Sequence, residues 1–456
     1  MTAPAAAANA GLRRVIGFWG GTALVVGMTI GSGIFRKPPT IAGLVPDPRV
    51  VLGLWVAIGI ITLCGALTLA ELASMLPETG GVYVYLRRGY GEGAAFVFGW
   101  LSVLVSAPAT VGALATVSVE FLLGALRIPP DRLPGWGVPA VAIGVIAFFT
   151  IVNLVGTKTG TAVQGALTVI KVSALVILIL AVFTLGQGSW ANLSPAAGAQ
   201  VEGSKLARAV SSVLWTYDGW IAAAAVAGEV LAPQKLLRKI IIAGVLTLIG
   251  IYVFANVAYH YMLPVDVMVQ EKGGIAARVM SEIFGPVGAS LIGFAIVASV
   301  TGALSANVLA RPRVAFAMAR EGLTFRALGH AHPRFNTPDV AILVQGVLAA
   351  VMVAVLQDFD KLTTYFVVVE WFALIFAVGA VFALRRRLPD AIRPFKVPLY
   401  PLVPLVFVVG TAVGLGTIVW GEWTNGNKSP VFGLGIAALG IPFYLFVRKK
   451  RDSVAG

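Results

Sequence analysis

Long apolar stretches separated by short polar segments run along the whole chain. Each of them is long enough for a helix to cross most or all of the roughly 30 Å hydrocarbon core of a bilayer. They lie near residues 15–44, 51–77, 93–126, 138–155, 160–186, 207–230, 236–263, 285–310, 338–357, 361–384, 400–420 and 431–447. The pattern predicts an all-α polytopic membrane protein with twelve transmembrane helices and both termini on the same side.

The first apolar stretch is interrupted near its middle by Gly31-Ser32-Gly33. Glycine is a poor helix former, and hydrocarbon offers no water to the backbone groups that a break releases. Such a break leaves one helix end with spare carbonyls, which attract a cation, and another with spare N–H groups, which attract an anion. The two ends together suit a zwitterion. Close helix packing through small residues is the alternative explanation.

The sixth stretch carries a similar interruption, because residues 215–220 read WTYDGW within an apolar segment. The two interrupted stretches are the first members of two five-helix halves. Interruptions at corresponding positions predict a five-plus-five inverted repeat, with helices 1 and 6 broken at the membrane midplane around a binding site.

This organisation divides the chain into one membrane domain with short ends. The expected parts are a disordered cytoplasmic N-terminus at 1–14, a single transporter domain at 15–448 (helices 1–5 about 15–186, helices 6–10 about 207–384, helices 11–12 about 400–447) and a cytoplasmic tail at 449–456.

Composition and charge agree with a membrane protein. Hydrophobic residues make up 58% of the chain and charged residues 12%, and the mean hydropathy is +0.90, which excludes an ordinary soluble protein. Of the 34 lysines and arginines, 22 fall on the side of the N-terminus and 11 on the other, with Lys171 inside a helix. By the positive-inside rule both termini are cytoplasmic, in a multi-pass protein of the plasma (inner) membrane. The net charge of +14 therefore reports topology rather than binding to nucleic acid.

Candidate residues for enzymatic or metal chemistry are scarce. The single cysteine, Cys64, lies in the second stretch, and the three histidines are scattered or in loops. A polytopic membrane enzyme would need a nucleophile, base or metal ligands clustered at one depth. We therefore expect no metal, no cofactor and no enzymatic activity.

Several motifs resemble those of one transporter superfamily. Residues 31–35 read GSGIF, Ala70-Glu71-Leu72 leads to PETGGVYVYL at 77–86, and YDGW at 217–220 leads to AGEV at 227–230. These motifs, with AMAREG at 317–322 and Glu370-Trp371, are similar to those of the amino acid–polyamine–organocation superfamily. The chain resembles in particular bacterial members of its L-type amino-acid transporter branch.

The resemblance implies a substrate position that agrees with the two helix breaks. Backbone N–H groups at the start of the second half of helix 1, with the Ser32 hydroxyl, would hold the substrate carboxylate. Carbonyls of both broken helices would receive the ammonium. The implied substrate-binding residues are Thr29, Ile30, Gly31, Ser32, Gly33, Ile34, Trp215, Thr216 and Asp218.

Trp215 and Lys171 receive further roles from the resemblance. Trp215 matches the aromatic gate that closes over the substrate from outside, and ordinary packing is its alternative. Lys171 matches a lysine that reaches the unwound part of helix 1, where sodium-coupled relatives hold a sodium ion. Its ammonium could replace that ion, carry a proton in the transport cycle, or serve structure only.

The expected roles of four acidic residues follow from the chemistry of buried carboxylates. Asp218 is expected to bind backbone N–H groups of the unwound segment, with recognition of a cationic side chain as the alternative. Glu370 is either a proton site or a partner in an interhelical bond. Glu71 and Glu229 are expected to contact loop arginines near cytoplasmic helix ends.

Together with these observations, the resemblance implies a sodium-independent exchanger of small neutral L-amino acids that works by alternating access. A proton-coupled symporter and a carrier of cationic amino acids or polyamines remain the alternatives. Light chains of the branch join a glycoprotein through an extracellular cysteine between helices 3 and 4. Residues 126–132 lack one here, so no disulfide-linked heavy subunit is expected.

Overall fold

The computed structural model describes residues 16–455 except 79, 130–131, 156, 196–198, 226, 228–229, 272–273, 336, 425 and 427–428. The expected N-terminal segment 1–14 and residue Glu229 therefore lie outside the described residues. The described chain folds into helices, and its one β-bridge joins Ile16 to Val230.

The helices follow the predicted apolar stretches closely. Their bounds are α1 Phe18–Thr29, α2 Gly33–Leu44, α3 Pro48–Met75, α4 Val82–Tyr90, α5 Glu92–Leu101, η1 Ser102–Ser106, α6 Ala107–Ala125, α7 Gly137–Val155, α8 Thr157–Leu185, η3 Trp190–Leu193, α9 Gly203–Tyr217, α10 Ala222–Ala225, α11 Pro233–Met262, α12 Val265–Val269, α13 Ile275–Ala310, α14 Pro312–Arg320, η5 Arg326–Gly329, α15 Asp339–Leu356, α16 Phe359–Arg387, α17 Leu402–Thr424 and α18 Ser429–Ala455.

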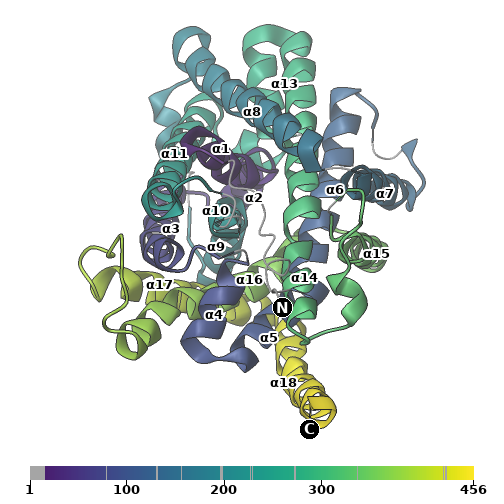
Figure 1. The fold of residues 1–456 in the computed structure, drawn as a ribbon. Helices are drawn as coiled ribbons and strands as arrows, with labels where there is room; N and C mark the ends of the chain where they lie inside the picture. Colours follow the sequence, from purple (N-terminus) through teal and green to yellow (C-terminus); the bar gives the residue numbers. More distant parts are fainter. Residues whose placement is uncertain are drawn as a thin grey trace.

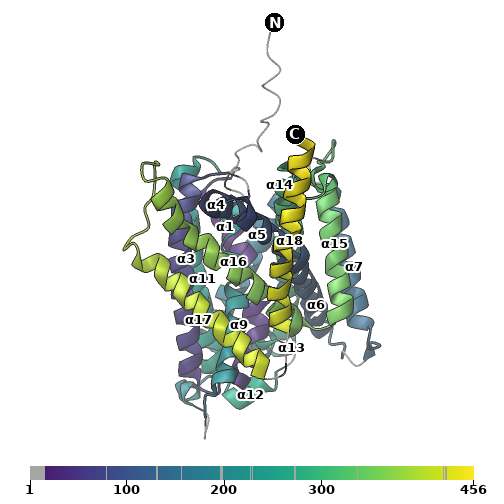
Figure 2. The same cartoon turned by 90° about the horizontal axis from the view of Figure 1, so that it is seen from below.

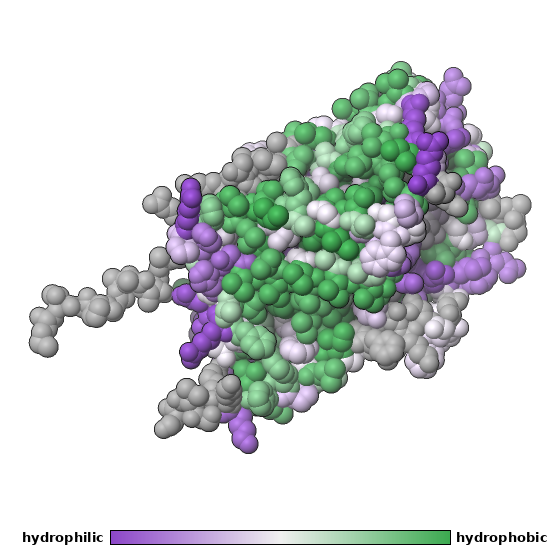
Figure 3. All heavy atoms as spheres, turned by 90° about the vertical axis from the view of Figure 1, so that its right-hand side faces the viewer, coloured by the Kyte–Doolittle hydropathy of each residue, from purple (hydrophilic) through white to green (hydrophobic). Residues whose placement is uncertain are grey.

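Ten segments of the described chain are long and apolar enough to cross a membrane. The molecular surface agrees, since an apolar band separates two polar ends (Figure 3). Figure 2 shows α4, α14 and the end of α18 at one of these ends and α12 at the other. These two ends are called the α4 end and the α12 end below. The chain is therefore a multi-pass membrane protein.

The broken helices lie near the middle of the bundle. In Figure 1, α1, α2, α9 and α10 are surrounded by α3 and α11 on one side and by α6, α7 and α15 on the other. Direct contacts join α1 to α8, α10 and α11, and α2 to α9. Flanking helices therefore bury the segments whose backbone bonding is interrupted.

The structure also differs from the predicted helix bounds in several places. The third stretch contains a π-helical turn, η1, between α5 and α6, and α13 begins ten residues before the predicted 285, with a kink at Gly285 where φ is 64°. The expected C-terminal tail is largely helical, because α18 continues to Ala455. The polar connection after α13 contains α14, and Arg311 between them keeps helical geometry with φ −66° and ψ −35°, so the helical path continues to Arg320.

Candidate functional site

The predicted interruption of the first helix is confirmed. α1 ends at Thr29, Ile30 leaves helical geometry with ψ of 86°, and α2 begins at Gly33 after Ser32. The first N–H groups of α2 have no acceptor within the helix by its geometry. The Ser32 hydroxyl is buried and has no hydrogen-bond partner among the described residues. Donors suited to an anion are therefore gathered at the start of α2.

The break after α9 lies against the break between α1 and α2. α9 ends at Tyr217, and Asp218 is extended with ψ of 154°. Gly219 has φ of 107°, and a Cβ there would lie 3.0 Å from the carbonyl carbon of Met28. On the other side, a Cβ at Gly33 would lie 2.7 Å from Cβ of Thr216. Both glycines thus permit the close approach of the two broken helices.

Tyr252 of α11 joins the two breaks, and nothing in the sequence pattern indicated this role. Its hydroxyl lies 3.0 Å from the carbonyl oxygen of Thr29 and 2.9 Å from that of Thr216. Both carbonyls belong to the group expected to receive a substrate ammonium. Since a carbonyl oxygen has two lone pairs, each can accept a second donor. Tyr252 therefore fixes the spacing of two candidate acceptors.

Lys171 of α8 reaches the unwound segment, as the resemblance implied. Its fully buried ammonium donates to the carbonyl oxygens of Gly27 at 2.8 Å, Ile30 at 2.9 Å and Ser299 at 3.1 Å. These oxygens come from α1, from the break and from α13. One fixed positive charge thus satisfies carbonyls that the interruption releases.

Trp215 lies near the end of α9 with its side chain turned toward α16. It is 7% exposed and meets Phe366 edge to face, with ring centroids 5.2 Å apart, and Phe359 in the same way at 5.9 Å. The three rings form an aromatic layer beside the breaks. The arrangement is compatible with both the gating and the packing interpretations.

Asp218 and Glu370 share a partner that the sequence did not indicate. A terminal nitrogen of Arg311 lies 3.4 Å from Oδ2 of Asp218, and the other lies 3.6 Å from Oε2 of Glu370. Asp218 was expected to bind backbone N–H groups; its carboxylate has a backbone hydrogen bond with Gly219 and also faces an arginine. Glu370 takes part in an interhelical ion pair, the second of its two interpretations.

From the sequence, Arg311 falls in the polar connection after the eighth apolar stretch, among the 22 arginines and lysines on the side of the N-terminus. Its side chain is only 12% exposed, because helical geometry continues through Arg311 from α13 into α14 and the residue does not lie in a loop. Pro312, the next residue, was the one signal in the sequence that a helix begins here, because proline is common in the first turn of a helix.

Glu71 of α3 contacts the arginines expected for it. Arg385 donates to both of its oxygens, at 3.0 Å and 2.7 Å, and Arg393 lies 3.4 Å away. The backbone N–H of Val397 donates to it at 2.7 Å. The carboxylate is 1% exposed, so a buried charge is fully compensated here.

Ion pairs close both ends of the bundle around the breaks. At the α12 end, Lys37 of α2 binds Asp360 of α16 at 2.5 Å and Thr363 at 3.1 Å. At the α4 end, Glu321 accepts hydrogen bonds from Arg87 and from Tyr83 of α4. Burial, together with the hydrogen bond to Glu321, raises the pKa of Tyr83, so its phenol remains a donor.

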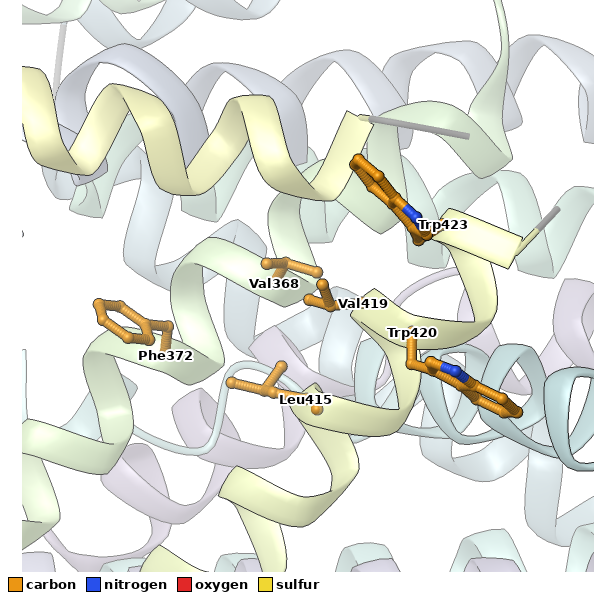
Figure 4. Close-up of a pocket in the computed structure, with 7 residues that line it drawn as sticks. Val368, Phe372, Leu415, Val419, Trp420 and Trp423 are labelled. Carbon is orange, nitrogen blue, oxygen red and sulfur yellow. The ribbon is translucent and has the colours of Figure 1, made fainter. Parts of the chain in front are cut away.

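Two hollows differ in their suitability for an amino acid. A crevice of about 390 Å³ between α16 and α17 is lined by apolar and indole side chains such as Leu415 and Trp420 (Figure 4). Its described lining carries no charged group that could pair with a zwitterion. A smaller hollow of about 70 Å³ is lined by residues of both broken helices and by two charged side chains, including Met28, Gly219, Arg311 and Glu370.

Within the described part of the chain, no cluster of histidine, cysteine and acidic residues could hold a metal.

Comparison with known proteins connects this geometry to a family. The model of the amino acid permease family matches residues 16–444. The serine/threonine exchanger SteT of Bacillus subtilis is 35% identical, over 97% of this chain and 99% of its own. The large neutral amino acids transporter small subunit 2 of Mus musculus is 29% identical, over 97% and 83%. The b(0,+)-type amino acid transporter 1 of the same species is 26% identical, over 87% and 81%.

These relatives confirm the resemblance to the L-type branch that the motifs had indicated. The matched family and these relatives are transporters and not enzymes. The chain therefore belongs to the amino acid permease family of membrane transporters.

Proposed function

We propose that the protein is a sodium-independent exchanger of small neutral L-amino acids that works by alternating access. The observation that carries the proposal is the contact between the two helix breaks. It brings the start of α2, whose first N–H groups have no acceptor within the helix, close to the end of α9, and the segment after α9 close to the end of α1. A zwitterion of one α-amino acid complements the N–H groups of a helix start and the carbonyls of helix ends.

In this proposal the substrate carboxylate binds the start of α2, at the N–H groups of Ser32, Gly33 and Ile34 and at the Ser32 hydroxyl. That hydroxyl is buried without another partner among the described residues, which favours a ligand there. The ammonium binds carbonyls of the 29–31 and 215–218 segments. Trp215, in its aromatic layer, closes over the bound substrate.

Lys171 supports the absence of sodium coupling. Its ammonium already donates to carbonyls of Gly27, Ile30 and Ser299, which a hard cation would otherwise coordinate. A second positive charge at the same place would meet direct repulsion. Transport therefore needs no sodium ion in this region.

The proposed architecture has twelve transmembrane helices in a five-plus-five inverted repeat. α1 with α2 and α9 with α10 are the broken first helices of the halves, and α17 and α18 follow them. The transporter domain is placed at 15–448 with both termini cytoplasmic. Support comes from the positions of the breaks and from the bias of arginine and lysine, which is a topology signal.

Exchange and a small substrate are supported by one relative, since SteT is named a serine/threonine exchanger. No disulfide-linked heavy subunit is proposed, because Cys64 lies within α3, inside a candidate membrane span. A thiol at that depth is unsuited to a bridge with an extracellular partner.

The test is uptake of a labelled amino-acid panel into proteoliposomes. We expect uptake of serine, threonine and alanine to depend on internal amino acid and to be unaffected by an imposed sodium gradient. Uptake into empty vesicles that follows an inward proton gradient would instead identify a symporter. Equal uptake with and without internal amino acid, in the absence of gradients, would contradict exchange.

Replacing Trp215 with alanine is expected to lower turnover about tenfold while equilibrium binding changes less. The ring closes the occluded intermediate in this proposal, and closure of such elements frequently limits turnover. The measurements are exchange rate and substrate-dependent thermal stabilisation of the purified variant. Trp420→Ala is the matched control, because Trp420 on α17 is 57% exposed and far from the breaks in sequence. Equal turnover in Trp215→Ala and the parent would assign Trp215 to packing.

A further inference from the structure

Three charged side chains meet beside the helix breaks without touching Lys171. Arg311 faces Asp218 at 3.4 Å and Glu370 at 3.6 Å, and their exposed side-chain fractions are 12%, 11% and 3%. The Lys171 ammonium donates instead to three backbone carbonyls. Arg311 is therefore the positive charge that compensates these two buried carboxylates.

Arg311 is also held by neutral contacts that fix its direction. Its Nε donates to Oδ1 of Asn307 at 2.8 Å, and its guanidinium lies over the ring of Phe366, 5.2 Å from the centroid. It lies between α13 and α14 with helical backbone geometry, φ −66° and ψ −35°, so the surrounding helix fixes the position of its backbone. The guanidinium is thus oriented toward the carboxylates by the surrounding fold.

The cluster adjoins the place where a substrate side chain would project. Asp218 directly follows α9, and the preceding residues supply carbonyls of the proposed ammonium site. Arg311, Glu370 and Gly219 line the hollow of about 70 Å³. A substrate side chain that enters this hollow therefore meets the guanidinium of Arg311 before it can reach either carboxylate.

Two carboxylates beside an amino-acid site are the chemistry expected for binding a lysine or arginine side chain. Here that position is already taken by a guanidinium from the protein itself. We propose that Arg311 is a specificity-determining residue: it fills the cation position between Asp218 and Glu370 and thereby excludes cationic amino acids. The inference rests on the proposed function, because it assigns the side-chain part of the same site.

The first test is Arg311→Ala, which removes the tethered guanidinium and opens space beside both carboxylates. The ratio of L-arginine to L-serine uptake into proteoliposomes is expected to rise about tenfold or more, as close charge pairs in desolvated sites carry at least this much. Arg320→Ala is the matched control. Its guanidinium lies over Phe316 of its own helix, 5.8 Å from the ring centroid, so the ratio should stay at the parent value.

A second variant separates recognition from a general loosening of the site. In Arg311→Ala with Asp218→Asn, the gain for L-arginine should disappear, because the carboxylate next to α9 is gone. If the double variant keeps the gain, the enlarged space and not the charge is responsible, and the inference is wrong.

Folding of the single variant is the main experimental risk, since it leaves two buried carboxylates without a cation. The double variant Arg311→Ala, Glu370→Gln leaves only one buried carboxylate without a cation. We expect the same rise in L-arginine uptake for this variant. Methylguanidinium should inhibit L-arginine uptake by either variant and leave the parent unaffected.

The outcomes also distinguish this inference from the proposed function. A parent protein that exchanges neutral amino acids, with both Arg311 variants folded and still excluding L-arginine, would overturn the role of Arg311 alone. Parent protein that takes up L-arginine as readily as L-serine would overturn it as well. Failure of the parent to bind or exchange any amino acid would overturn the proposed function itself.

Discussion

Replacing Gly33 with leucine is expected to weaken substrate binding at least about thirtyfold while leaving a folded, monodisperse protein. Any Cβ at this position would lie 2.7 Å from Cβ and Cγ2 of Thr216. The side chain therefore forces the start of α2 away from the end of α9. Overpacking of this kind costs about 1–3 kcal/mol, and about 2 kcal/mol corresponds to thirtyfold in affinity.

The measurement is equilibrium binding of labelled serine to the purified variant, with size-exclusion chromatography for folding. Gly53→Leu in α3 is the matched control, because a Cβ at Gly53 has no neighbouring atom within 4 Å. We expect this control to bind as the parent does. Unchanged affinity in Gly33→Leu would show that the contact between the two breaks is not part of the substrate site.

Replacing Lys171 with alanine is expected to lower transport about a hundredfold. The substitution leaves the carbonyls of Gly27, Ile30 and Ser299 without the ammonium that binds them. Hydrogen bonds to a charged group contribute about 1.5–3 kcal/mol each, so losing even one of the three disturbs the unwound segment strongly. Lys171→Met, which keeps the side-chain volume, should show nearly the same loss. Lys205→Ala, at an exposed ion pair with Glu202, should transport normally.

The same variants separate a fixed charge from a proton carrier. If Lys171 is a fixed cation, uptake by the parent ignores an imposed proton gradient and depends on internal amino acid. If it releases a proton in each cycle, an inward proton gradient accelerates net uptake by the parent, and Lys171→Ala loses the response. Sodium-driven accumulation by the parent would contradict both interpretations of Lys171 and would indicate that a sodium ion binds in this region.

Features with a local cause were predictable from the sequence. The break at residues 30–32 follows from two glycines around a serine in an apolar stretch, and the break after Tyr217 follows from Asp218-Gly219. Lys171 was recognisable because an ammonium in the middle of an apolar helix needs a partner. In each case the residue type is unusual for its immediate surroundings.

Features produced by packing between distant segments were not predictable. Tyr252 looks like any aromatic residue of an apolar helix, and its role depends on two carbonyls 223 and 36 residues away. Arg311 follows the pattern of loop arginines, and it is buried because helical geometry continues through it from α13 into α14. Asp218 was interpreted through its own backbone because the arginine opposite it lies 93 residues further along the chain.

The contacts of Glu71 with Arg385, Arg393 and the Val397 N–H divide the bundle into parts that we expect to differ in mobility. Its buried carboxylate joins α3 to Arg385 at the end of α16 and to the Val397 N–H on the way to α17. Pulling these segments apart would strand a charge inside the protein, at a cost of about 3–5 kcal/mol. The three helices are therefore expected to travel as one rigid frame. We expect any hinge that opens the α4 end to lie at the two interrupted helices, where the backbone already lacks helical hydrogen bonds.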